Sequence, residues 1–119
     1  MIEFQAQDVS YSEDLEEWEY FQVLFKEKDG PGGKYVLLQR QFEIPDGGLS
    51  YFECDEIERS GSHVIRNAKL SRERLQIEVP GERGGKWVIA FDIDDRRYAA
   101  LKEVLGILLS KPSRLEIES

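Results

Sequence analysis

The sequence contains little cysteine, little histidine and no long hydrophobic run, and these shortages exclude several classes of protein. Cys54 is the single cysteine, so an internal disulfide is excluded, and a lone thiol suits a reducing compartment. No apolar segment approaches the roughly 20 residues needed to span a bilayer, and the acidic, alternating start of the chain is not typical of a signal peptide. We therefore expect a cytoplasmic protein that does not interact with a membrane.

Motifs for covalent catalysis and for zinc binding are also missing. Cys54 and His63 would be the only thiol and imidazole for a nucleophile and its base, but no nucleophile signature surrounds either residue. His63 has no second histidine or cysteine at the spacing of metal ligands. We expect Cys54 to be a small apolar core residue, and we expect no enzymatic activity and no cofactor.

Two pairs of carboxylates, Glu53 with Asp55 and Asp92 with Asp94, are spaced two residues apart. On a strand this spacing places both members on the same face, where oxygen ligands could hold a divalent cation. Plain solvent-facing alternation and, for Asp94, a helix cap are the competing interpretations, and caps and turns recruit aspartate far more often. We therefore expect no metal site.

Charge is the most pronounced feature of the composition. The 119 residues include 24 acidic and 16 basic side chains, which gives a net charge of −8. An acidic surface repels nucleic acid and anionic lipid and attracts basic proteins. The alternative is that this charge only keeps the protein soluble. In either case the composition predicts no nucleic-acid partner.

The length of 119 residues suits a single domain that spans residues 1–119 and holds one core. Alternation of apolar and polar residues with a period of two predicts strands, and turns rich in glycine and proline separate them. A nearly continuous apolar run is typical of a strand covered on both faces, and the alternating tail could add an edge strand. The expected strands are Ile2–Asp8, Glu17–Glu27, Lys34–Ile44, a segment from Tyr51, Val64–Leu70, Leu75–Val79 and the apolar run Trp87–Phe91.

A helix is predicted after the last of these strands, from Asp95 to Leu109, capped by Asp94 or Asp95. Its apolar residues recur at intervals of three and four. Gly106 should weaken the helix by about 1 kcal/mol relative to alanine, which suggests that something packs closely against it. The predicted fold is α+β: a curved, antiparallel β-sheet of about six strands, with this C-terminal helix packed on one face.

Three segments in this order carry a family resemblance. A strand ends in Leu38-Gln39-Arg40, a second begins with Tyr51-Phe52-Glu53, and a turn at Ser60-Gly61 leads to Leu70-Ser71 and a leucine-rich helix. This arrangement resembles the tenth family of immunity proteins from bacterial polymorphic toxin systems, over roughly residues 34–109. The resemblance implies a small cytoplasmic protein that binds a cognate toxin and neutralises it by occlusion.

An acidic segment with two aromatic residues is the predicted partner-binding surface. Charge would steer the approach of a basic toxin, and aromatic side chains would anchor the complex. In the competing interpretation, the aromatic residues belong to a second layer of the core. The alternatives to an immunity protein are a general interaction or adaptor domain and, after it, an enzyme without a recognisable motif. The predicted residues are Glu13, Asp14, Glu16, Glu17, Trp18, Glu19 and Tyr20.

Overall fold

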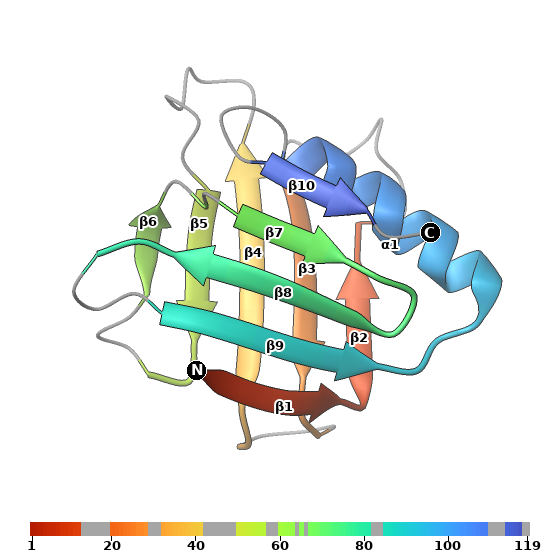
Figure 1. Cartoon of the computed structure of the whole chain (residues 1–119), viewed down its shortest axis with the longest axis horizontal. Coiled ribbons are helices and arrows are strands. Elements are labelled where there is room, and N and C mark those ends of the chain that lie inside the picture. The colour runs from red at the N-terminus through yellow and green to blue at the C-terminus, as the bar shows by residue number, and fades with distance from the viewer. Residues whose placement is uncertain are drawn as a thin grey trace.

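Two five-stranded β-sheets and one α-helix make up the part of the chain that the structure, a computed structural model, describes. Figure 1 shows the strands of one sheet running steeply across those of the other. The described residues are 1–12, 20–28, 32–41, 50–56, 60–63, 65, 67–81, 85–109 and 114–117.

The first sheet has the strand order β1-β9-β8-β7-β10 and is mixed. β1 runs parallel to β9, β10 runs parallel to β7, and the remaining pairs are antiparallel. Its strands are β1 (Ile2–Ala6), β7 (Asn67–Leu70), β8 (Arg74–Val79), β9 (Gly85–Phe91) and β10 (Arg114–Ile117).

The second sheet has the order β2-β3-β4-β5-β6 and is antiparallel throughout. Strands that are consecutive in the chain are neighbours in this sheet, as in a β-meander. Its strands are β2 (Asp8–Tyr11), β3 (Tyr20–Lys26), β4 (Tyr35–Gln41), β5 (Ser50–Cys54) and β6 (Gly61–His63).

The core fills the space between the two sheets, because alternate residues of β1–β5 and β7–β9 point into it. Phe52 of β5 meets Trp87 of β9 edge to face, with ring centroids 4.7 Å apart. Phe25 of β3 lies over Phe91 of β9 at 6.0 Å. These aromatic pairs bury large apolar areas and join the second sheet to the first.

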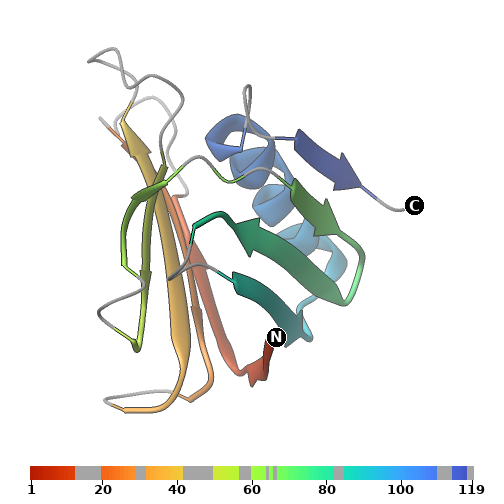
Figure 2. The same cartoon turned by 60° about the vertical axis from the view of Figure 1, so that its left-hand side comes forward.

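The helix α1 (Asp95–Leu108) packs against β3 and β4. Figure 2 shows α1 on the same side of the second sheet as the first sheet, so together they cover its inner face. Asp94 is the N-cap, and its side chain accepts a hydrogen bond of 2.8 Å from the backbone N–H of Arg97. The buried stripe of the helix consists of Leu101, Val104, Leu105 and Leu108.

The α+β class and the C-terminal helix packed on a sheet are thus confirmed. The strands, however, number ten in the described residues and form two sheets rather than one of about six strands. Part of the difference lies at the segment expected as one strand, Val64–Leu70: only Asn67–Leu70 is a described strand, β7, and β6 (Gly61–His63) comes just before the segment. β6 belongs to the second sheet and β7 to the first, so the chain changes sheets at Ile65, which is fully buried.

Three further expectations concern the faces of β9, the packing at Gly106 and the tail after the helix. The strand β9 is covered on one face only, because Val88 and Ala90 on its other face are half-buried. Gly106 is exposed, and no described atom beyond its chain neighbours and the backbone of its own helix lies within 4 Å of where its Cβ would stand, so the expected close packing is wrong. The alternating tail does form an edge strand, β10.

Candidate functional site

The predicted acidic surface falls largely outside the described residues. Glu13, Asp14, Glu16, Glu17, Trp18 and Glu19 all lie outside them. Tyr20 is the first residue of β3, and its backbone pairs with Gln41 of β4. The role of this segment in binding therefore stays a prediction.

Cys54 and His63 lie far from each other. His63 pairs with Ser50 at the start of β5, whereas Cys54 ends the same strand, four residues or about 13 Å away. Cys54 is 3% exposed, and its Sγ donates to the backbone carbonyl of Glu56 at 3.3 Å. A buried thiol with a carbonyl acceptor fits the expected core role.

The carboxylates that were spaced two apart have separate roles. Asp94 caps α1, Asp92 is exposed at the end of β9, and Glu53 accepts hydrogen bonds from two tyrosines. Among the described residues, no three histidine, cysteine, aspartate or glutamate side chains gather closely enough to hold a metal ion.

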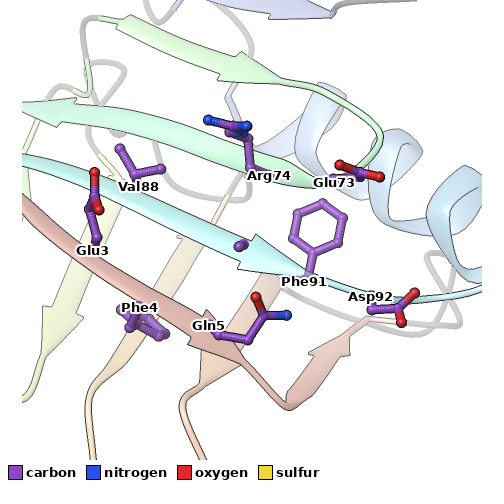
Figure 3. Close-up of a pocket in the computed structure, with 9 residues that line it drawn as sticks. Glu3, Phe4, Gln5, Glu73, Arg74, Val88, Phe91 and Asp92 are labelled. Atoms are coloured by element: carbon purple, nitrogen blue, oxygen red, sulfur yellow. The ribbon is translucent and has the colours of Figure 1, made fainter.

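A hollow of about 690 Å³ lies on the outer face of the first sheet. Its charged residues are Glu3, Glu73, Arg74 and Asp92, and the apolar side chain of Val88 lies among them. Figure 3 shows these charged groups spread along the hollow rather than directed at a common point. Without convergent groups to hold a small molecule, the hollow does not have the form of a ligand site.

The outer face of the second sheet has a different character. We call it the tyrosine face. Figure 2 shows that no described helix or strand lies over it. All its members are half-buried and alternate along the strands with fully buried core residues. The tyrosine face consists of Gln22 and Leu24 on β3, Tyr35, Leu37 and Gln39 on β4, and Tyr51 and Glu53 on β5.

Strand register arranges the tyrosine face in rows across the sheet. Leu24, Leu37 and Glu53 lie side by side on β3, β4 and β5. In the next row Gln22 lies beside Gln39, whose Nε2 donates to the Gln22 Oε1 at 2.8 Å. The two half-buried leucines lie among polar side chains that are already hydrogen-bonded, a composition typical of protein-binding surfaces.

Glu53 is the centre of the hydrogen bonding on this face. The Tyr35 hydroxyl donates to its Oε2 at 2.8 Å, and the Tyr51 hydroxyl donates to its Oε1 at 2.7 Å. Short bonds to a carboxylate are among the stronger hydrogen bonds in proteins. Each carboxylate oxygen therefore accepts one phenol, and both aromatic rings are held in place.

Ionisation of the two phenols is opposed by this arrangement. Burial, together with the hydrogen bond to Glu53, raises the pKa of Tyr35 to about 12. The hydrogen bond to Glu53, with burial as a second cause, raises the pKa of Tyr51. The raised pKa extends the pH range over which both tyrosines remain protonated donors further into the alkaline region.

Arg40 is the buried charged residue of β4, at 7% exposed. Its Nη1 donates to the backbone carbonyl of Leu108 at 3.3 Å, at the C-terminal end of α1. A cation there complements the negative end of the helix dipole, which has no basic residue in its own last turn. The arginine of the Leu-Gln-Arg segment therefore supports the fold and not the tyrosine face.

Tyr35, Tyr51 and Glu53 were not predicted from the sequence to form a partner-binding site, although Tyr51 and Glu53 occur in a segment that carries the family resemblance. The available signal was alternation, because the core residues Val36, Leu38 and Phe52 place their neighbours on the opposite face. Their meeting across two strands depends on register, which the sequence did not reveal.

No helix in the described residues is long and apolar enough to cross a membrane. Comparison of the chain with protein-family models, curated proteins and solved structures found no match.

Proposed function

We propose that this chain is an immunity protein that binds a cognate bacterial toxin domain and neutralises it by occluding it. The observation that carries the proposal is the tyrosine face, which no described helix or strand covers, and where hydrogen bonds to Glu53 hold two partly exposed tyrosines beside two half-buried leucines. An inhibitor of this kind acts by tight contact alone and requires no catalytic residue of its own.

Pre-organisation of the tyrosine face supports this function. Side chains that are already fixed lose less conformational entropy when a partner binds. Tyrosine also supplies a large contact area from few rotatable bonds, which is why it is frequent at interfaces. The fixed positions of Tyr35 and Tyr51 therefore favour a tight complex.

Charge supports a basic partner. The chain carries a net charge of −8, and such a field mainly accelerates association with a positively charged protein. The proposal places the complex in the cytoplasm, where the buried thiol of Cys54 would stay reduced. It also assigns no enzymatic activity and no nucleic-acid partner to the chain.

The test is protection of cells from a toxin. The chain is co-expressed with the C-terminal domain of a secreted toxin whose gene lies directly upstream of its own, and cell growth and complex formation are measured. We expect Leu37→Lys to abolish protection, because it adds a positive charge at the centre of the tyrosine face. Val88→Lys is the matched control, a half-buried aliphatic residue on the outer face of the first sheet.

The absence of such a toxin gene, or a toxin that kills despite the chain, would overturn the immunity function. Stable binding through the tyrosine face to a protein that is not a toxin would instead identify an adaptor domain. If Val88→Lys abolished protection and Leu37→Lys did not, the contact would lie on the first sheet.

A further inference from the structure

The tyrosine face contains one position with the chemistry to receive a specific side chain. Glu53 lines a hollow of about 890 Å³, together with Tyr35, Leu37 and Tyr51. The turn between β3 and β4 borders this hollow with Gly32 and Gly33. A side chain from a bound protein can therefore enter beside the carboxylate without displacing a described element.

Glu53 has unused capacity to accept hydrogen bonds. Its two oxygens each accept one phenolic O–H, and a carboxylate oxygen has two lone pairs. One acceptor position therefore remains on each oxygen of a carboxylate that the two tyrosines hold in place.

The negative charge of Glu53 is also not neutralised within the described part of the chain, where it has no ion-pair partner. Lys26 is the cation that lines the same hollow. Lys26 on β3 pairs with Asp8 on β2 and with Tyr35 on β4. This row is next to the row that contains Glu53. An incoming cation would therefore meet a carboxylate that attracts it.

We propose that Glu53, held between Tyr35 and Tyr51, is the anchor for an arginine side chain of a basic partner protein. A guanidinium presents two parallel N–H donors, which match the two free acceptor positions of a fixed carboxylate. The rings of the two tyrosines and the nearby Leu37 provide surfaces on which its planar group can stack. A lysine ammonium is a point charge and gains less from this geometry.

This inference rests on the proposed function in so far as the arginine belongs to the partner, but its test requires no toxin. The probes are blocked tri-arginine and tri-lysine peptides, which have the same charge. Binding to the whole chain is followed by the amide chemical shifts in NMR spectra. We expect arginine to bind several-fold more tightly than lysine, with the largest shifts at Tyr35, Leu37 and Glu53.

Three variants test which groups are responsible. Glu53→Gln should remove the preference for arginine, whereas Glu3→Gln, which changes the net charge equally on the outer face of the first sheet, should retain it. Tyr51→Phe should reduce the preference, because the carboxylate loses one of the two bonds that orient it. Circular dichroism establishes that each variant is folded before binding is measured.

Equal affinity for the two peptides, shifts that map to another face, or an unchanged preference in Glu53→Gln would each overturn the arginine anchor. Failure of the proposed function is distinguishable, because it would appear as a lack of protection in cells while the peptide preference remained. Conversely, full protection by Glu53→Gln would retain the immunity function and reject Glu53 as the anchor.

Discussion

Gly106 offers a direct test of the packing around the helix. It lies within α1, is exposed, and has open space where a Cβ would stand. Alanine in an exposed helix interior is more stable than glycine by about 1 kcal/mol, because glycine loses more backbone entropy on folding. Since Gly106 lies near the C-terminal end of α1, we expect Gly106→Ala to raise the free energy of unfolding by about 0.5–1 kcal/mol.

The corresponding rise in the melting temperature is about 2–4 °C for a domain of this length. Urea unfolding followed by circular dichroism gives the free energy, and calorimetry gives the temperature. Ala99→Gly is the matched control, because Ala99 is also exposed on α1 and needs no positive φ. It should lower the free energy of unfolding by about 1 kcal/mol.

A gain in the free energy of unfolding for Gly106→Ala and a loss for Ala99→Gly would support an open environment at Gly106. If Gly106→Ala lowered the stability while Ala99→Gly also lowered it, a neighbouring group would have to occupy the space beside Gly106. That result would refute the reasoning from the structure and restore the expectation of close packing drawn from the sequence.

Two further measurements examine the tyrosine face and the core. In a spectrophotometric titration, Tyr35 should ionise at a pH of about 12, and Glu53→Gln should lower that pKa. Because the pKa is raised on folding, the stability due to Tyr35 is complete below about pH 10 and is lost as the pH rises towards 12; a Tyr35→Phe variant with the same late titration would contradict the assignment. Phe52→Ala should lower the free energy of unfolding by about 3–5 kcal/mol in urea, since it leaves a cavity against Trp87. Phe52→Leu should cost much less, and equal losses from both would contradict a well-packed pair.

The sequence was sufficient for features that depend on neighbours along the chain. Alternation along Leu75, Ile77 and Val79 identified the buried face of β8. The spacing of apolar residues by three and four positions identified the buried stripe of α1. Aspartate before the helix predicted the cap that Asp94 provides. These patterns are reliable because the period of a strand or helix is a property of the local backbone.

Partition of the strands into two sheets required the tertiary structure. The strand expected at Val64–Leu70 forms only in part, as β7 (Asn67–Leu70) of the first sheet, while Gly61–His63 just before it form β6 of the second sheet. The parallel pairing of β1 with β9 sets Ile2 beside Trp87, which is distant in the sequence, and leaves no local signal. Alternation shows which face of a strand is buried, but not which strand lies beside it.

What the sequence by itself determined is therefore the class of the fold, the buried face of most strands, the helix with its cap, and an acidic balance that suits a basic partner. Only the tertiary structure brought Tyr35 to Glu53, 18 residues away, and Arg40 to Leu108, 68 residues away. Contacts at such separations depend on strand register and on how the layers stack. Those are set by the packing of the whole core, because a slip of one residue would turn every buried side chain to the opposite face.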